Sequence, residues 1–183
     1  MHIALKTVVA VLASVPLCAW ALLEDNIIAF EASKSYLDIT RSDILISSED
    51  SVGIHIAAQN LANDLKQVTG VIRSLEKLNG INSVQAHSAT AIIAGSLNST
   101  LIKHLSSKGL LDVSDLQGKW ESFVTSVVDN ALPGVRRAFV IAGSDTRGTI
   151  FGIYTLSGQA GQSPYVSLLF SSCSFRPSIF FRG

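Results

Sequence analysis

The chain has 183 residues, of which 14 are basic, 14 are acidic and 48% are hydrophobic. This length allows one ordinary domain and is too short for a complete eight-stranded α/β barrel. The formal net charge is zero and no basic run is longer than Arg136-Arg137, so we expect no nucleic-acid partner. The two cysteines, Cys18 and Cys173, are too few for a disulfide framework or a zinc site.

The N-terminus has the three-part pattern of a secretory signal peptide. Lys6 precedes an apolar run, and the small residues Ala19 and Ala21 follow it. The apolar run is short for a membrane span and is interrupted by a proline. We therefore predict that residues 1–21 are a signal peptide and that residues 22–165 form one domain. The mature protein is then secreted and extracellular, with no stable membrane association.

Within residues 22–165 the predicted elements alternate between strands and helices. Short apolar runs indicate buried strands, and apolar residues that recur every three or four positions indicate amphipathic helices. The predicted strands are Ile27–Phe30, Ile44–Ile46, Ala91–Ala94, Phe123–Val128 and Ala138–Ala142. The predicted helices are Ser51–Gln67, Ser99–Ser107 and Thr146–Gln159, and Gly70 and Gly109 end the first two.

Two features of the sequence indicate how these elements are arranged. Pro133-Gly134 supplies turn geometry between the last two predicted strands, which implies an antiparallel pair. The sequence Ile-Ala-Gly-Ser occurs at Ile93–Ser96 and again at Ile141–Ser144, each time at the end of a strand and before a helix. We therefore predict an α/β (α+β-like) domain in which helices pack on a layered, mixed β-sheet.

Asn98-Ser99-Thr100 matches the acceptor motif for N-linked glycosylation. In a chain that enters the secretory pathway, this motif predicts a surface loop with Asn98 as the acceptor. An acceptor motif that is never used is the alternative interpretation.

The segment Val140–Gln162 carries the most candidate chemistry. Gly143 lies before a predicted helix start, where free backbone N–H groups can hold an anion. Gly143 and Gly148 also match the spacing of a phosphate-binding loop, but the lysine that such a loop requires is missing, so we do not expect nucleotide binding. A structural role explains the same residues. Asp145 can cap the helix, and Gly148 and Gly152 leave one helix face bare for close packing on the sheet.

Other catalytic signatures are weak. The chain has no Gly-x-Ser-x-Gly sequence, which serine hydrolases of the α/β class use to present their nucleophile. The histidines are spread along the chain, so we expect no metal site and no cofactor. They are His2, His55, His87 and His104, with His55 predicted on the polar, solvated face of its helix.

Carboxylates and one tryptophan leave two glycan-related hypotheses open. A pair of carboxylates can hydrolyse a glycoside, but the sequence shows no cleft shared by Glu121, Asp129 and Asp145. Trp120 can form a platform for a sugar ring. Partial burial is the more usual role for a tryptophan at the entrance of a strand, and we expect that role here.

The last 18 residues, 166–183, differ from the rest of the chain. They contain no acidic residue and no persistent period, and they carry a cluster of apolar side chains. The codons for Val166-Ser167 can contain the bases that begin an intron. We interpret residues 166–183 as a non-homologous tail translated from an unspliced intron, and we expect it to promote aggregation. Sequencing of the transcript tests this interpretation.

Four segments of the chain together resemble the N-terminal domain of glycoside hydrolase family 115, whose members are xylan α-1,2-glucuronidases. The segments are Trp120–Phe123, Pro133–Val135, Val140–Tyr154 and Gly161–Pro164. The resemblance is most specific from Gly143 to Tyr154 and extends weakly back to about Ile44. It implies an accessory α/β domain, because the catalytic and uronate-binding residues of the family lie in a barrel and later domains that have no counterpart here.

The resemblance therefore implies the N-terminal, non-catalytic domain of a secreted, fungal-like xylan α-1,2-glucuronidase, a glycoside hydrolase that debranches hemicellulose. We expect a fragment without the barrel to be inactive alone, and to reach glucuronoxylan only through the missing catalytic domains. No catalytic residue is carried over. The alternative hypothesis is a stand-alone carbohydrate-binding or interaction module that uses Trp120 and the loop after Gly143.

Overall fold

The structure is a computed structural model that describes residues 28–29, 36–84, 87–161 and 180–182. The predicted signal peptide and most of the predicted apolar tail lie outside these residues. None of the described helices is both long enough and apolar enough to cross a membrane.

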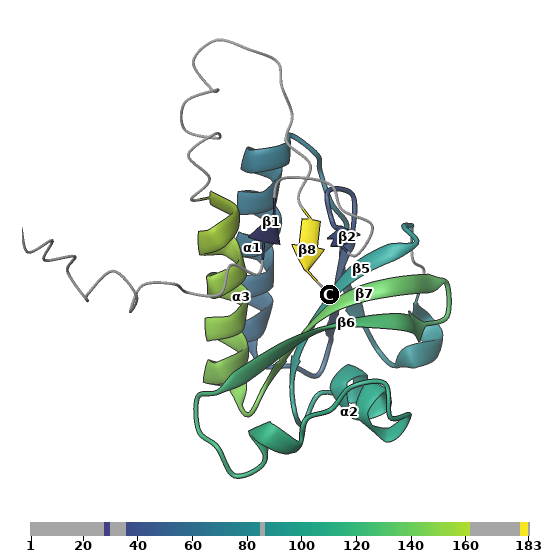
Figure 1. The fold of residues 1–183 in the computed structure, drawn as a ribbon, viewed down its shortest axis with the longest axis vertical. Helices are drawn as coiled ribbons and strands as arrows, with labels where there is room; N and C mark the ends of the chain where they lie inside the picture. Colours follow the sequence, from purple (N-terminus) through teal and green to yellow (C-terminus); the bar gives the residue numbers. More distant parts are fainter. Residues whose placement is uncertain (1–27, 30–35, 85–86, 162–179, 183) are drawn as a thin grey trace, which may run out of the picture.

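A five-stranded mixed sheet forms the centre of the domain (Figure 1). Its order is β4-β3-β5-β7-β6, in which the first four strands are parallel and β6 is antiparallel to β7. The strands are β3 (Asp43–Ser47), β4 (Leu75–Leu78), β5 (Thr90–Ser96), β6 (Phe123–Leu132) and β7 (Val135–Gly143). This arrangement confirms the predicted α/β fold with a mixed sheet.

Helices cover both faces of this sheet. The helices α1 (Val52–Thr69) and α3 (Thr146–Gly161) lie side by side on one face, and α2 (Thr100–Ser107) lies on the other (Figure 1). Successive side chains of a strand point to opposite faces, so each central strand contributes to two hydrophobic clusters. Ile44, Ile92 and Ile141 belong to the cluster with α1 and α3, whereas Leu45, Ile93 and Val140 belong to the cluster with α2. Burial on both faces explains why these strands are continuously apolar in sequence.

Helix α1 follows its predicted apolar stripe. Ile54, Leu61 and Leu65 are fully buried. Gly70 ends the helix in a left-handed conformation with φ of 67°, and its N–H donates to the Lys66 carbonyl at 2.7 Å. A residue without a side chain adopts this conformation at little cost, which confirms the prediction that Gly70 is the C-terminal stop.

The β6–β7 hairpin is longer than predicted. Leu132 pairs with Val135, so the connection shrinks to Pro133-Gly134, with φ of 83° at Gly134. The register shifts between Asp129 and Leu132, where Asn130 has φ of 52°. Asp129 is paired with Arg137, and the two residues Asn130 and Ala131 lie opposite Arg136 alone, so the stretch between the two predicted strands continues β6 with a bulge.

Several short strands were not predicted. The strand β4 is only four residues long and contains two charged residues, so it lacks the apolar run of the central strands. A separate three-stranded sheet has the order β1-β8-β2, with β8 antiparallel to both neighbours. Its strands are β1 (Ile28–Ala29), β2 (Tyr36–Asp38) and β8 (Phe180–Arg182). Of these, β1 lies within the predicted strand Ile27–Phe30, whereas β2 and β8 were not predicted. The last strand comes from the segment that we interpreted as a non-homologous tail.

Arg73, just before β4, connects the end of α1 to the turn after β2. It is buried, and its Nη2 donates to the carbonyl of Thr40 at 2.7 Å while Nη1 donates to Thr69 Oγ1 at 3.2 Å. Burial lowers the pKa of Arg73 to about 10, and the charge of nearby Asp38 opposes this effect. The guanidinium therefore stays charged at neutral pH and acts as a structural clamp.

Candidate functional site

The carboxyl ends of the parallel strands form one edge of the sheet, which we call the carboxyl edge. It consists of the loops that follow β3, β5 and β7, and of the segment that enters β6. The chain leaves β3 toward α1 on one face, leaves β5 toward α2 on the other face, and leaves β7 toward α3 on the first face. Open α/β sheets bind ligands at such points, where the connections turn to opposite faces. The candidate site is therefore expected at this edge.

Asp145 lies at the carboxyl edge, directly before α3. Its Oδ1 accepts the backbone N–H of Gly148 at 2.8 Å, and its Oδ2 accepts the backbone N–H of Glu121 at 2.9 Å. These two hydrogen bonds, with that from Gly148 the larger effect, hold the pKa of Asp145 below its usual value. The carboxylate occupies the position at the helix start where an external anion would bind, and it has no role as a proton donor at neutral pH.

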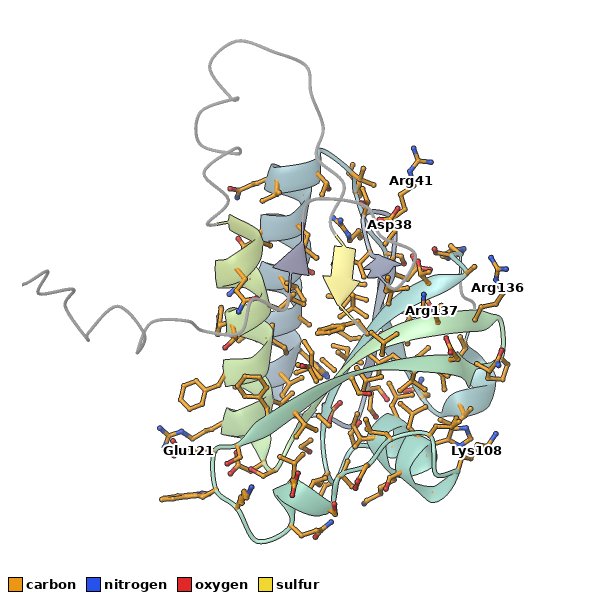
Figure 2. All side chains as sticks on the ribbon, in the orientation of Figure 1. Asp38, Arg41, Lys108, Glu121, Arg136 and Arg137 are labelled. Atoms are coloured by element: carbon orange, nitrogen blue, oxygen red, sulfur yellow. The ribbon has the colours of Figure 1, made fainter. Side chains whose placement is uncertain are left out.

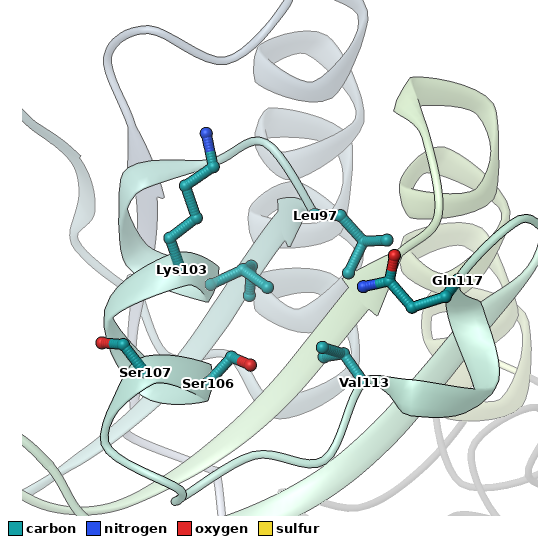
Figure 3. A pocket seen from close by; sticks show the side chains of 7 residues that line it. Leu97, Lys103, Ser106, Ser107, Val113 and Gln117 are labelled. Carbon is teal, nitrogen blue, oxygen red and sulfur yellow. The ribbon is translucent and has the colours of Figure 1, made fainter.

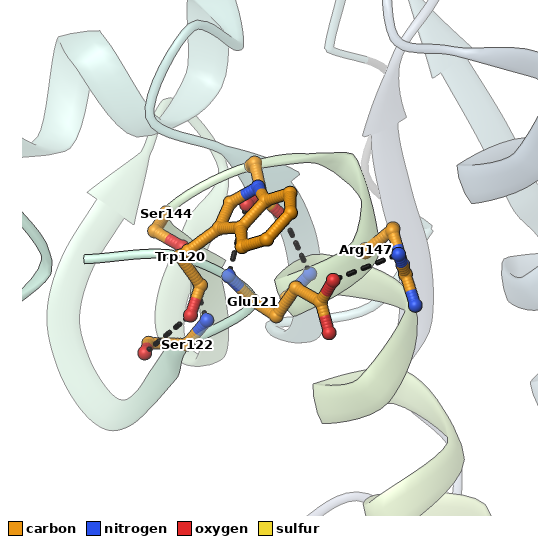
Figure 4. Close-up of polar contacts among 7 residues, drawn as sticks. Trp120, Glu121, Ser122, Ser144 and Arg147 are labelled. Atoms are coloured by element: carbon orange, nitrogen blue, oxygen red, sulfur yellow. Dashed lines mark hydrogen bonds and ion pairs between the residues drawn. The ribbon is translucent and has the colours of Figure 1, made fainter. Parts of the chain in front are cut away.

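Trp120, Glu121 and Ser122 form a turn that packs against the start of α3 (Figure 4). Glu121 has φ of 52°, and its Oε1 lies 2.8 Å from Arg147 Nη1. The N–H of Ser122 donates to Ser144 Oγ at 3.1 Å, and the Ser122 hydroxyl donates to the Trp120 carbonyl at 3.0 Å. We call residues 120–122 and 144–147 together the Trp120 turn.

Trp120 itself is 79% exposed, so the prediction that it is partly buried is wrong. Its carbonyl is bonded within the turn, and the left-handed backbone of Glu121 redirects the chain immediately after it. The indole ring therefore stays outside the core, next to the loop after Gly143.

Three glycines bring the Trp120 turn, α3 and the sheet into close contact. A Cβ atom at Gly143 would lie 2.2 Å from the backbone nitrogen of Thr149, and one at Gly148 would lie 2.2 Å from the Ser122 carbonyl oxygen. At Gly152 it would lie 2.5 Å from Ile141 Cγ2. All three positions exclude any side chain, and the bare helix face is in contact with this domain's own β6 and β7.

A second group of polar residues at the carboxyl edge links the loops after β3 and β5. Asp50 Oδ2 accepts the Ser99 hydroxyl at 3.1 Å and the Ser47 N–H at 3.1 Å. Thr100 Oγ1 donates to Glu49 Oε2 at 3.1 Å. Burial is the largest influence on Asp50 and raises the pKa of its carboxyl above the usual value, although the Ser99 hydrogen bond opposes it.

No sequence pattern indicated this second group. Its members lie about fifty residues apart in the chain, on loops with no recognisable motif apart from the glycosylation acceptor. The only available signal was that both loops follow buried parallel strands, which places them at the same edge of the sheet. Asn98 lies there in an exposed turn.

The three histidines in the described part of the chain occupy separate places, and His2 lies outside that part. His55 is half-buried, and its Nε2 lies 3.1 Å from the Ser47 carbonyl oxygen, so it is more enclosed than the predicted solvated position. His87 Nε2 lies 3.4 Å from Glu76 Oε1 beside β4. His104 is on α2, where burial and, to a smaller extent, Lys108 lower its pKa. Among the described residues no group of three histidine, cysteine or acidic side chains is positioned to hold a metal ion.

Of the three candidate catalytic carboxylates, Glu121 and Asp145 lie together in the Trp120 turn, whereas Asp129 lies apart from them. Asp129 Oδ1 accepts from Arg137 Nε at 2.9 Å, and Arg137 lies six residues before Gly143 along β7. At about 3.3 Å per residue, Asp129 is roughly 20 Å from the carboxyl edge. Figure 2 shows Glu121 and Arg137 at opposite ends of the strands. Glycosidase carboxyl pairs are about 5–9.5 Å apart, so Asp129 cannot pair with Glu121 or Asp145 in this domain.

Two cavities open on the described surface, one beside the loop after β5 and one beside β4. One, of about 360 Å³, lies between α2 and the loop that follows it, and Lys103, Ser106, Ser107 and Gln117 provide its polar lining (Figure 3). It contains no acidic residue. The other, of about 350 Å³, lies beside β4, and its one carboxylate, Glu76, faces His87. Neither cavity places two carboxyl groups across an open space.

No family model matches this chain, and no curated protein matches it. Among solved structures, a family GH115 4-O-methyl-α-glucuronidase with specificity for decorated arabinogalactans is similar, with a TM-score of 0.50 and 22% sequence identity. The match covers 71% of this chain and 15% of that chain. The structure of CpGH84D has a TM-score of 0.49 and 14% identity, covering 85% of this chain and 22% of that one. This chain therefore spans less than a quarter of either protein, and the first likeness shows a shared fold.

Proposed function

We propose that this chain is a non-catalytic, accessory α/β domain of a glycoside hydrolase that removes glucuronic acid branches from xylan. Support comes from the fold likeness to part of a family GH115 enzyme and from the segments of the sequence that resemble that family. The observation that carries the proposal is the arrangement of the acidic residues. Asp145 is held by backbone N–H groups, Glu121 by Arg147, and Asp129 by Arg137 at the far end of β7.

In this proposal the catalytic carboxylates belong to other parts of a longer enzyme, and this domain packs against them. Gly148 and Gly152 of α3 are not available for that contact, because Gly148 packs against Ser122 and Gly152 packs against β6 and β7 of the same domain. The outer faces of α1 and α3 carry exposed apolar side chains instead. They are Val52, Ile56, Phe151 and Tyr154.

The direct test is an activity assay on glucuronoxylan. The purified full chain is incubated with the polymer, and released 4-O-methylglucuronic acid is quantified, with a complete family GH115 enzyme as the positive control. We expect no release above the level without enzyme, because hydrolysis requires two carboxyl groups positioned across the scissile bond. Reproducible release, lost after heat denaturation of the chain, would contradict the proposal.

The exposure of Trp120 favours a second candidate, a carbohydrate-binding module. An exposed indole presents a flat apolar face, and the ion-paired Glu121 and Arg147 beside it provide polar groups that can bind sugar hydroxyls. Affinity electrophoresis in gels that contain glucuronoxylan separates the two candidates. The accessory domain predicts no retardation, whereas the binding module predicts retardation that W120A abolishes. F151A, which removes another exposed aromatic ring, is the matched control.

A further inference from the structure

The turn between β5 and α2 presents Asn98 to solvent. Asn98 is exposed, whereas Ser99, the next residue, is 4% exposed. Within the described part of the chain, the Asn98 side-chain amide has no hydrogen-bond partner that a modification would displace. The backbone of the turn is fixed, because the Leu97 N–H donates to the Gly143 carbonyl at 2.8 Å and the Ser99 N–H to the Ser96 carbonyl at 2.9 Å.

The two residues that follow Asn98 make hydrogen bonds within the folded domain. Ser99 donates its hydroxyl to Asp50, and its carbonyl accepts the Lys103 N–H in the first turn of α2. The Thr100 hydroxyl donates to Glu49. Recognition of the acceptor motif depends on the hydroxyl residue at its third position, here Thr100. In the folded domain this hydroxyl is bonded to the loop after β3, and Ser99 is enclosed beside it.

We propose that Asn98 carries an N-linked oligosaccharide. This oligosaccharide is attached during folding, before the loop after β3 comes into contact with the start of α2. The proposal is independent of the function proposed above, since it depends on the turn, its contacts and the entry of the chain into the secretory pathway. In the reaction, Asn98 Nδ2 forms a bond to C1 of the first sugar. The bond between that carbon and the diphosphate of a polyprenyl diphosphate-linked oligosaccharide breaks. The nitrogen gives one proton to solvent, and the polyprenyl diphosphate leaves with the electron pair.

The position of this oligosaccharide has a consequence for the surface of the domain. Asn98 belongs to the connection that runs from β5 to α2, on the opposite face of the sheet from α1 and α3. Its neighbour Leu97 lines the cavity beside α2. A hydrated glycan attached here keeps the α2 side of the carboxyl edge in solvent. The exposed apolar side chains of α1 and α3 remain uncovered.

The experiment expresses the full chain in a eukaryotic secretory host and compares its electrophoretic mobility before and after treatment with an enzyme that removes N-linked glycans. We expect a shift equivalent to one glycan. N98Q and T100A should lose the shift. T100S and S99A are the matched controls and should keep it, because T100S retains the hydroxyl and S99A alters only the middle position while removing the contact with Asp50.

A parallel version replaces residues 1–21 with a secretion signal of known function. A shift seen only with that replacement supports Asn98 as the acceptor and contradicts the signal-peptide prediction. The absence of a shift in both versions overturns the proposal.

The timing has its own test. Unglycosylated protein from bacteria and a peptide of residues 93–104 are each offered to microsomal transferase with its lipid-linked donor. We expect modification of the peptide and none of the folded chain. Equal modification of the two would show that closure of the loop after β3 does not protect the motif, and would overturn this part of the proposal.

Discussion

At the carboxyl edge, two aspartates experience opposite electrostatic environments. Asp145 receives backbone hydrogen bonds that favour its ionised form and lower its pKa. Asp50 is partly buried between two loops, and the loss of hydration outweighs its hydrogen bonds and raises its pKa. The two residues therefore contribute to stability with opposite dependence on pH.

For Asp50 we expect the D50N variant to lose the contribution of this carboxyl group to the pH dependence of the free energy of unfolding. A folded pKa above the unfolded value of about 3.9 means that the folded chain holds the proton more tightly. The stabilisation is thus complete below the unfolded pKa and is lost as the pH rises through the folded pKa. Asparagine keeps an acceptor for Ser47 and Ser99 without a charge. Urea unfolding at pH values from 4 to 7 should therefore show D50N gaining stability relative to wild type as the pH rises.

The matched control is D50A, which removes the acceptor as well as the charge. It should be less stable than D50N at every pH, because the Ser99 hydroxyl and the Ser47 N–H both lose their partner. A difference between wild type and D50N that stays constant over this pH range would show that burial of the charge does not govern Asp50.

Among the elements, α3 depends most directly on residues without side chains. Gly152 faces Ile141 of β7 and Phe123 of β6, whereas Gly158 lies in the same helix, is exposed, and has no atom within 4 Å of an added Cβ. Gly152 and Gly158 are therefore both helical, but Gly152 is packed against the sheet and Gly158 is exposed to solvent. This difference separates the effect of close packing from that of helix propensity.

We expect G152A to destabilise the domain by about 1–3 kcal/mol, because the new methyl group forces α3 away from the sheet. G158A should instead stabilise it by about 0.5–1 kcal/mol, since alanine is the better helix former and meets no neighbour. Urea unfolding followed by circular dichroism measures both changes. If G152A and G158A changed the free energy of unfolding by the same amount, close approach of α3 to β6 and β7 would not be a requirement of the fold.

At the scale of the whole molecule, the described residues form two sheets with separate hydrogen-bond ladders. The five-stranded sheet holds both hydrophobic clusters, whereas the three-stranded sheet joins β8 from the end of the chain to β1 and β2 near its beginning. Leu37 of β2 is buried in the cluster with α1 and α3. The smaller sheet therefore packs against the hydrophobic cluster with α1 and α3, but its hydrogen bonds are separate from those of the five-stranded sheet.

Deletion of residues 166–183 tests this division. The deletion removes β8, which is the strand between β1 and β2, so we expect faster amide exchange at Tyr36–Asp38. Amides of β5 and β7 should keep their protection, because their partners all lie within the five-stranded sheet. Hydrogen–deuterium exchange followed by mass spectrometry measures both regions. Loss of protection in β5 and β7 would show that the terminal segment is needed for the core.

The sequence predicted the elements whose pattern is local. Continuous apolar runs identified β3, β5 and β7, the apolar stripe identified α1, and Pro133-Gly134 identified the hairpin. The same approach missed β4, which is short and polar, and it placed Trp120 in the wrong environment. The reason is that the exposure of one side chain depends on the turn that carries it, here on the backbone of Glu121 and the contacts of Ser122.

The order of apolar and polar residues was thus enough to determine an α/β domain with a mixed sheet, because burial on one or both faces leaves a period in the sequence. Only the tertiary structure decided which loops meet at the carboxyl edge. The contacts of Asp50 with Ser99 and of Asp145 with Glu121 join segments 49 and 24 residues apart. Such contacts arise from the order of strands in the sheet, and no local period records that order.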